Sequence, residues 1–264
     1  MSVDLLELVR VGKAFGGATV LDDLSFAVRQ GSLTALLGPN GAGRTMVAEL
    51  VCGMQRPDAG AIRFAGVPIG HLPAHAVAAL GLVRIWRHAR PIRGLTVLEQ
   101  VIAGGFLRRG IGFWPSLLHL PAARRAATAQ AGRAHALLAR VGLAQRADHP
   151  AEALGQGELR RMEVARALAA APRLLLLDEP AEGLAASDSA AIGVLLRELR
   201  DEGMTLLVIA HNMQFVADHC DHVVVMRAGR HIAEGPPATC LGHPAVQDAL
   251  LGRQQDADSL RARR

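Results

Sequence analysis

The first third of the chain alternates short apolar runs with turns. Four runs, at residues 5–11, 24–28, 33–37 and 62–65, have the length and apolar character of β-strands. Turns containing Gly, Pro or Asp separate them. The third run leads through a Gly-rich loop into residues 44–52, where the apolar positions repeat with helical spacing. This succession of strand, loop and helix predicts an α/β unit.

The middle of the chain has a different pattern. From about residue 97 to 141 the apolar positions have helical spacing, and the segment is rich in Ala and Arg. A Gly- and Trp-containing stretch at 110–115 interrupts it. We interpret residues from about 90 to 165 as a helical subdomain inserted into the α/β fold.

The last third returns to α/β alternation. Predicted helices cover 158–171 and a segment from the N-cap residue Ser187 to about 201, and predicted strands cover 174–177, 205–210 and 222–226. The strand at 174–177 is apolar at every position, as in parallel strands that are buried on both faces. We therefore predict one domain over residues 1–250, followed by a polar tail at 251–264.

Composition excludes several classes of protein. Half of the residues are apolar, so the chain can bury a core. The three cysteines have neither zinc-site nor disulfide-framework spacing, and no apolar run is long enough to cross a bilayer. The acidic N-terminus does not resemble a signal peptide. The net charge of +5 is spread out and aromatic residues are scarce, so we predict no nucleic-acid partner.

The basic residues are almost all arginines. Of 29 basic residues, only Lys13 is a lysine. Chemistry that ordinarily uses a lysine must therefore use Lys13, use an arginine in its place, or be absent.

The loop after the third strand carries the first candidate chemistry. Residues 38–45 read GPNGAGRT, close to the phosphate-loop pattern G-x-x-x-x-G-K-[ST]. Glycines let backbone N–H groups surround a polyphosphate, and the following helix adds its positive end. Here Arg44 stands at the lysine position. By itself the segment could also be a Gly-rich turn.

Two carboxylates and a histidine follow other strands. Asp178 and Glu179 end the apolar run at 174–177, and His211 ends the run at 205–210. The carboxyl ends of parallel strands meet at the edge where α/β proteins bind ligands. There Asp178 could hold Mg²⁺ and Glu179 could deprotonate a water. The alternatives are that the acids cap a turn and that His211 is structural.

The order of these motifs resembles the ATP-binding subunits of ABC transporters over roughly residues 5–245. Four segments (81–101, 110–126, 160–169 and 174–184) are similar to the branched-chain amino acid importer subfamily. The resemblance implies a P-loop NTPase core with an antiparallel β subdomain and an inserted helical subdomain. It also implies that two ATP-binding subunits sandwich ATP and Mg²⁺. Permease subunits at the cytoplasmic face of the membrane would be their partners, with a periplasmic binding protein acting indirectly.

The same resemblance implies residue roles. Phe15 would stack on adenine, although it could instead pack in the core. The phosphates would lie against Gly38, Pro39, Asn40, Gly41, Ala42, Gly43, Arg44 and Thr45, with position 46 at the α-phosphate. Thr45 and Asp178 would hold Mg²⁺, while Glu179 and His211 would be catalytic. Gly155 and Gly157, in a signature loop opening the helix that carries Arg160 and Arg161, would contact ATP of the opposite subunit. Those two arginines could instead lie on a solvated face.

Several positions depart from the family pattern. Arg44, Met46 and Arg87 stand at the positions of a lysine, a Ser or Thr, and a glutamine that helps to bind Mg²⁺. A guanidinium has no acceptor for a metal ion. Gly155, Glu158, Ala185 and Ala186 also differ from the pattern, and Glu158 would place negative charge near the phosphates.

We therefore expect impaired turnover, and we keep three hypotheses. The first is a working or slow importer ATPase for branched-chain or related amino acids. The second is a nucleotide-binding subunit that hydrolyses little and pairs with a competent ATPase. The third, which the single nucleotide-binding domain and the transporter-type insert disfavour, is an ABC ATPase outside transport.

Overall fold

A six-stranded sheet forms the centre of the molecule. The computed structural model describes residues 3–88, 90–105 and 121–251. The strands of this sheet are β3 (Leu33–Leu37), β6 (Leu82–Ile85), β7 (Leu174–Asp178), β8 (Thr205–Ala210), β9 (His222–Arg227) and β10 (Arg230–Gly235). Their spatial order is β10-β9-β3-β8-β7-β6, and all neighbours are parallel except the β9–β10 pair. The carboxyl ends of β3, β6, β7 and β8 therefore lie along one edge.

The central strands are buried on both faces, which explains their continuous apolar sequence. In β7, Leu175 and Leu177 belong to one apolar cluster, and Leu174 and Leu176 belong to a second cluster on the other face. A strand that is buried on both faces has no solvent-exposed side, so apolar and polar residues need not alternate along it. The predicted parallel strand at 174–177 is confirmed.

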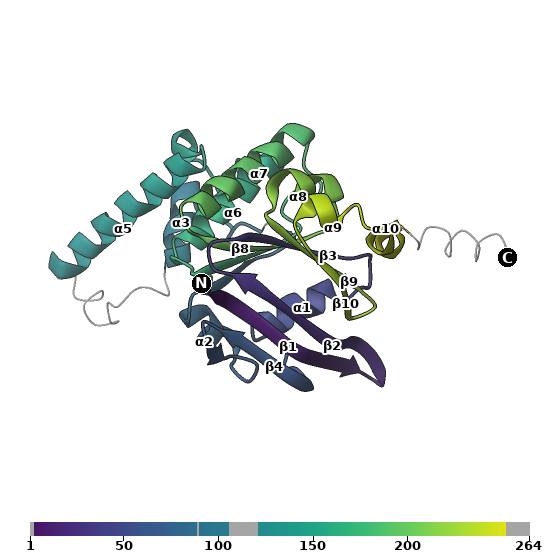
Figure 1. The fold of residues 1–264 in the computed structure, drawn as a ribbon. Helices are drawn as coiled ribbons and strands as arrows, with labels where there is room; N and C mark the ends of the chain where they lie inside the picture. Colours follow the sequence, from purple (N-terminus) through teal and green to yellow (C-terminus); the bar gives the residue numbers. More distant parts are fainter. Residues whose placement is uncertain (1–2, 89, 106–120, 252–264) are drawn as a thin grey trace.

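An antiparallel sheet lies beside the second cluster. It contains β1 (Asp4–Phe15), β2 (Ala18–Arg29), β4 (Ala59–Phe64) and β5 (Val67–Pro68) in the order β2-β1-β4-β5. Helix α1 (Arg44–Val51) buries Val47, Leu50 and Val51 in the cluster that this sheet shares with the six-stranded sheet. Helix α1 thus packs between the two sheets (Figure 1).

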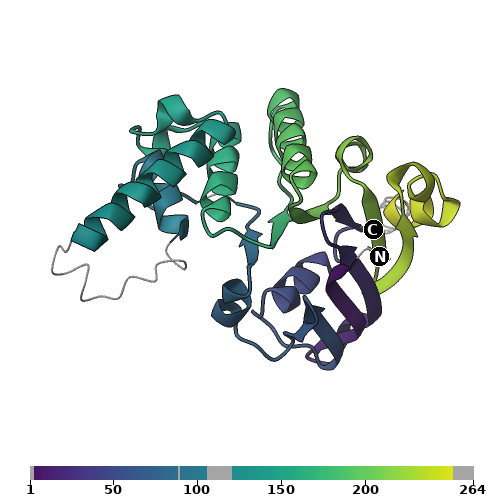
Figure 2. The ribbon, with the colours of Figure 1, turned by 60° about the vertical axis from the view of Figure 1, so that its left-hand side comes forward.

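The other face of the six-stranded sheet is covered by helices. They include α3 (Val97–Gly104), α5 (Pro121–Arg140), α6 (Gln156–Leu168), α7 (Ala186–Asp201) and α8 (Met213–His219). The remaining helical segments are α2 (Ala74–Ala79), η2 (Ala144–Arg146), η3 (Ala151–Ala153), α9 (Pro237–Cys240) and α10 (Pro244–Leu251). Figure 2 shows α3, α5 and α6 grouped on one side, away from the antiparallel sheet.

The predicted fold class is confirmed, with local corrections. Helix α7 begins at Ala186 after an N-cap at Ala185 that makes no side-chain capping bond, so the predicted cap at Ser187 is wrong. Asp188 places its negative charge in the first turn, which favours a helix start without a capping side chain. Helix α6 begins two residues before the predicted start and ends at Leu168. The predicted interruption at 110–115 lies outside the described residues, as does the tail predicted at 251–264 apart from Leu251, which ends helix α10.

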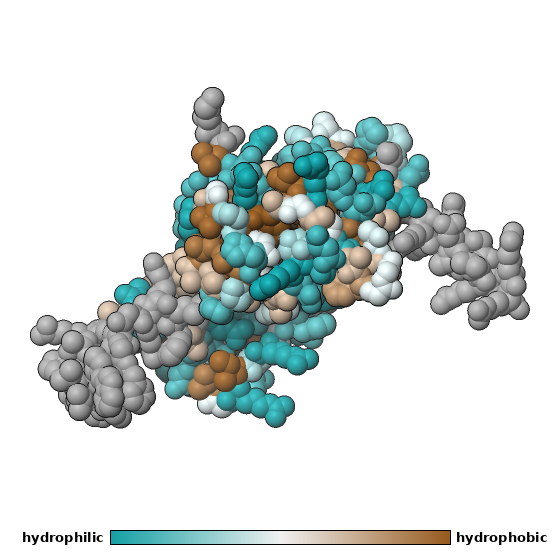
Figure 3. All heavy atoms as spheres, turned by 90° about the horizontal axis from the view of Figure 1, so that it is seen from below, coloured by the Kyte–Doolittle hydropathy of each residue, from teal (hydrophilic) through white to brown (hydrophobic). Residues whose placement is uncertain are grey.

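The surface of the described part offers no continuous apolar belt in the view of Figure 3. Apolar side chains there form separate patches between hydrophilic ones. Among the described residues, no helix combines the length and apolar character that a membrane span requires.

Candidate functional site

The loop after β3 has a backbone that only small residues permit. Gly41 and Gly43 adopt φ values of 76° and 100°, in the left-handed region that favours glycine. A Cβ atom on Gly38 would lie 2.4 Å from the carbonyl oxygen of Met226. The loop ends at the N-terminus of α1, where backbone N–H groups lack partners within the helix. It can therefore receive an anion.

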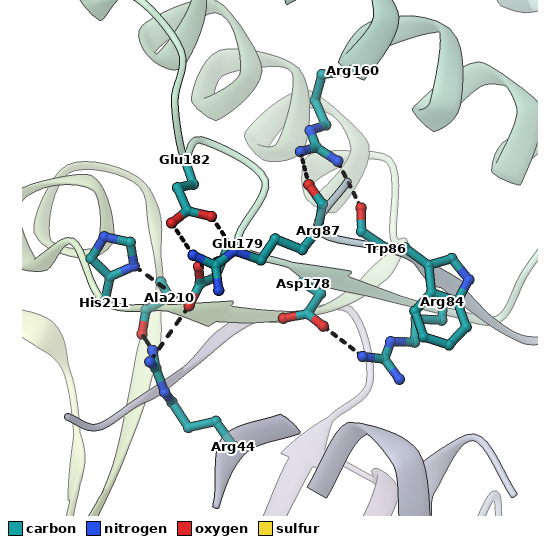
Figure 4. A network of polar contacts seen from close by, with 10 residues as sticks. All are labelled: Arg44, Arg84, Trp86, Arg87, Arg160, Asp178, Glu179, Glu182, Ala210 and His211. Atoms are coloured by element: carbon teal, nitrogen blue, oxygen red, sulfur yellow. Dashed lines mark hydrogen bonds and ion pairs between the residues drawn. The ribbon is translucent and has the colours of Figure 1, made fainter. Parts of the chain in front are cut away.

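Arg44, the first residue of α1, turns towards the strand ends. Its guanidinium donates a hydrogen bond to the carbonyl oxygen of Ala210 at the end of β8 (Figure 4). The Nη2 atom lies 3.5 Å from Oε1 of Glu179. Only 7% of the side chain is exposed, and this burial lowers the pKa of Arg44. The cation that replaces the phosphate-loop lysine is thus paired with a predicted catalytic acid.

Asp178 and Glu179 reach the same edge from β7. Asp178 ends the strand, and its Oδ2 atom accepts a hydrogen bond of 2.5 Å from Arg84 on β6. The guanidinium of Arg84 also stacks 4.0 Å from the ring centroid of Trp86. Glu179 follows with φ of 50°, a left-handed conformation that is uncommon for a residue with a side chain. Its backbone N–H donates to the carbonyl of Ile209.

Arg87 and Glu182 complete the surroundings of Glu179. Arg87 donates through Nε and Nη2 to the two carboxylate oxygens of Glu182, and its Nε lies 3.1 Å from Oε2 of Glu179. His211 Nδ1 lies 3.5 Å from the other oxygen of Glu179. Figure 4 shows the Arg87 guanidinium between the two glutamates. Both oxygens of Glu179 therefore face cations or an imidazole.

The two glutamates have opposite pKa shifts. Burial raises the pKa of Glu179, and the neighbouring carboxylate of Glu182 raises it further. The hydrogen bonds from Arg87 lower the pKa of Glu182 and raise the pKa of Arg87. Glu182 therefore holds negative charge more firmly than Glu179 does.

Arg160 on α6 fixes the segment that carries Arg87. It donates a bond of 2.7 Å to the carbonyl of Trp86 and a second bond to the carbonyl of Arg87. Its guanidinium also lies 3.4 Å from Glu163, which pairs with Arg166 at 2.9 Å. Only 5% of Arg160 is exposed, so the alternative that this arginine lies on a solvated face is wrong. Arg160 can be buried in the helix packing because the two carbonyls and Glu163 satisfy its N–H groups.

Three further residues that the sequence predicts to contact ATP or Mg²⁺ lie outside the polar network around Glu179. Phe15 ends β1 with 45% of its surface exposed, so packing in the core is wrong for it. Thr45 is exposed at the start of α1, whereas Met46 packs partly against the cluster between the sheets. Lys13 lies 5.0 Å from the Phe15 ring centroid and pairs with Asp58 at 2.7 Å. The one lysine is thus already paired.

The signature loop has local roles in the structure. Gly155 is the N-cap of α6, and its N–H donates to Glu158 at 3.1 Å. This hydrogen bond lowers the pKa of Glu158, which also pairs with Arg146. A Cβ atom on Gly157 would lie 2.3 Å from the carboxylate carbon of Asp188. Glu158 therefore caps a helix.

Four groups of this site are not predicted by the sequence. They are the side chains of Arg84 and Glu182, the carbonyl of Ala210, and the guanidinium of Arg160, which binds the carbonyls of Trp86 and Arg87. Arg84 and Glu182 lie within three residues of Arg87 and Glu179, so proximity to those predicted site residues was the available signal. No local pattern indicates the Ala210 carbonyl.

Comparison with known proteins identifies the family. The sequence profile of the ABC transporter family matches residues 21–182. The chain is 34% identical to the high-affinity branched-chain amino acid transport ATP-binding protein LivG of Salmonella typhimurium, over 96% of this chain and 99% of that protein. BraF of Pseudomonas aeruginosa, with the same description, is also 34% identical over 96% of this chain and 99% of its own length.

A solved structure agrees with this result. The ADP conformation of MJ1267, an ATP-binding cassette of an ABC transporter, superposes with a TM-score of 0.82 at 27% identity, covering 95% of this chain and all of that one. The chain therefore belongs to the ATP-binding subunits of ABC transporters, which hydrolyse ATP to drive transport.

Proposed function

We propose that the chain is the ATP-binding subunit of an importer for branched-chain or related hydrophobic amino acids, and that it hydrolyses ATP slowly. Its partners are permease subunits at the cytoplasmic face of the membrane and a second ATP-binding subunit, with a periplasmic binding protein acting indirectly. The amino acid assignment is supported by LivG and BraF, whose names state that transport.

One observation carries the catalytic part of the proposal. The acidic pair Asp178–Glu179 lies at the same sheet edge as the phosphate loop 38–45, with only β8 between the two strands that lead to them. A water beside a terminal phosphate held by this loop would meet Glu179. Glu179 would accept a proton from that water, and His211 would orient the phosphate or the water.

The residues also fit a magnesium ion. Thr45 offers a hydroxyl oxygen and Asp178 a carboxylate, which are ligands that Mg²⁺ prefers alongside phosphate oxygens and water. These two residues would hold the ion, which would neutralise phosphate charge when bound. Arg84 must share the Asp178 carboxylate with it, because its Nη2 lies 2.5 Å from Oδ2. Arg87 adds no oxygen ligand.

Two arginines favour slow turnover. Arg44 and Arg87 both pair with Glu179, and the charge of these two cations makes the carboxylate a weaker acceptor for a proton from water. This observation also favours a second candidate function, a subunit that binds nucleotide, hydrolyses little and works beside a competent ATPase. The two candidates share the fold and the partners and differ in the turnover of this chain.

The transport assignment has a direct test. The chain is purified with its permease subunits, reconstituted in vesicles, and assayed for ATP-dependent accumulation of radiolabelled leucine on addition of the binding protein. We expect accumulation with ATP and none with ADP. Nucleotide-dependent accumulation of another solute class, with none of leucine, valine or isoleucine, would contradict the amino acid assignment.

Replacing Arg44 with lysine is expected to raise the rate of ATP hydrolysis by about 10-fold. An ammonium group is smaller than a guanidinium and cannot bridge Ala210 and Glu179 with the same fork, so it should release the carboxylate. The rate is measured as phosphate release by the full chain. The control is Arg63→Lys, an exposed position on β4. Equal rates for the two variants would show that Arg44 does not limit turnover.

The pH dependence of hydrolysis offers another test, through Glu182→Gln. Glu179 must be ionised to accept a proton, so activity is lost as the pH falls through its raised pKa. Arg44, Arg87, His211 and Glu182 face this carboxylate, and Glu182 alone raises its pKa by charge. Removing that charge should move the acid limb of the pH–rate profile to lower pH. A limb that stays in place or moves to higher pH would contradict this assignment.

A further inference from the structure

We propose that Glu182 is a positioning residue that holds the guanidinium of Arg87 in the nucleotide site, where Arg87 binds the terminal phosphate and makes the site prefer a nucleoside triphosphate to a diphosphate. This inference rests on the proposed function, because it assigns a specificity-determining pair to the same site.

The first support is the geometry of the Arg87–Glu182 pair. A guanidinium has five N–H donors in one plane, and Glu182 accepts one hydrogen bond from Nε and one from Nη2. The carboxylate thereby fixes the plane of the guanidinium. It leaves N–H groups for a second anion, and a phosphate matches such a planar fork.

The second support is exposure. Three arginines surround the carboxylates, but the side chains of Arg44 and Arg84 are only 7% and 5% exposed. Arg87 is 47% exposed although it reaches the buried carboxylate of Glu179. Of these three cations, Arg87 is therefore the one that a nucleotide arriving from solvent can contact without rearrangement of the core.

The third support is that the backbone of Arg87 is held as well. Arg160, which is buried, donates to the carbonyls of Trp86 and Arg87. An exposed arginine normally loses considerable side-chain freedom when it binds a ligand. With its backbone held by Arg160 and its side chain by Glu182, Arg87 has lost much of that freedom before the ligand arrives.

Charge balance explains why Glu182 is needed. Glu179 is a buried carboxylate, and without a second anion the Arg87 guanidinium would pair with Glu179 alone. Glu182 competes for the same guanidinium from a position that is 30% exposed. The shared pairing keeps Arg87 between the two carboxylates, from which a terminal phosphate can draw it away from Glu179.

The test is isothermal titration calorimetry of the full chain with Mg²⁺ and either AMP-PNP, a non-hydrolysable triphosphate, or ADP. We expect Glu182→Gln to weaken AMP-PNP binding by about 5-fold and Arg87→Gln by about 10-fold, because charge-assisted bonds to one phosphate are lost. ADP binding should change by less than about 2-fold in both, since ADP lacks that phosphate. The double variant should resemble Arg87→Gln, because the two residues act as a unit.

The matched control is Glu202→Gln, which removes an exposed carboxylate paired with Arg140 at the other end of α7. Equal weakening of AMP-PNP and ADP in Glu182→Gln, or additive losses in the double variant, would overturn the positioning role. Failure of the unmodified chain to bind either nucleotide would instead overturn the proposed function. Glu182→Asp keeps the charge with a shorter reach and should give an intermediate AMP-PNP affinity.

Discussion

Replacing Glu179 with glutamine is expected to lower the rate of ATP hydrolysis at least about 100-fold, because a general base contributes that much or more to such reactions. Glutamine has the same shape but cannot accept a proton from water. The substitution also removes the negative charge that pairs with Arg44 and Arg87. Both guanidinia then become available to phosphate, so affinity for AMP-PNP should be retained or rise.

Phosphate release and nucleotide affinity, measured on the same preparation, separate these two effects. Glu202→Gln again serves as the control, since that carboxylate is exposed and lies at the other end of α7. A rate within about 3-fold of the unmodified chain would show that another residue is the base, because the loss would be far smaller than the removal of a general base causes. His211, whose Nδ1 lies 3.5 Å from Glu179, is the residue to test next by substitution with alanine.

Replacing Arg160 with methionine is expected to lower the free energy of unfolding by about 3 kcal/mol, at the lower end for breaking a buried ion pair. Methionine fills the space but donates no hydrogen bond. The carbonyls of Trp86 and Arg87 lose a charged donor, and Glu163, only 4% exposed, loses one of its two arginines. Arg166 still pairs with Glu163, which keeps the loss near that lower end.

Urea unfolding of the full chain measures this difference. The neighbouring Arg161→Met is the matched control, because Arg161 is half-buried and the bond to the carbonyl of Arg87 comes from Arg160. It should change the free energy of unfolding by less than about 0.5 kcal/mol. Equal destabilisation by the two variants would mean that the buried network does not stabilise the fold as its geometry indicates.

The strands and loops that follow local rules could be predicted from the sequence. An all-leucine run ending in two acids, and a Gly-rich loop between an apolar strand and a helix, each depend on a few neighbouring residues. The structure places Asp178, Glu179 and Arg44 together, as the parallel arrangement of β3 and β7 requires. Strand β6 was missed because it is four residues long and contains Arg84.

The partners within the site could not be predicted, because tertiary packing selects them. Arg160 and Arg161 are adjacent and chemically identical, yet only Arg160 reaches the carbonyls beyond β6. Helical spacing alone cannot say which of the two faces a neighbouring element. In the same way, Glu182 can bind Arg87 only because β6 and β7 are neighbouring parallel strands, which brings the segments that follow them together.

The left-handed backbone at Glu179 has a consequence for how this site is maintained. A residue with a side chain pays on the order of 1 kcal/mol for such a conformation, and a glycine would avoid that cost. Losing the carboxylate would, however, leave the buried guanidinium of Arg44 without this anion, at a cost of about 3 kcal/mol or more. The ion pair with Arg44 thus outweighs the strain of the backbone, so exchanging Glu179 for glycine would lower the stability of the fold as well as remove the acceptor for a water proton.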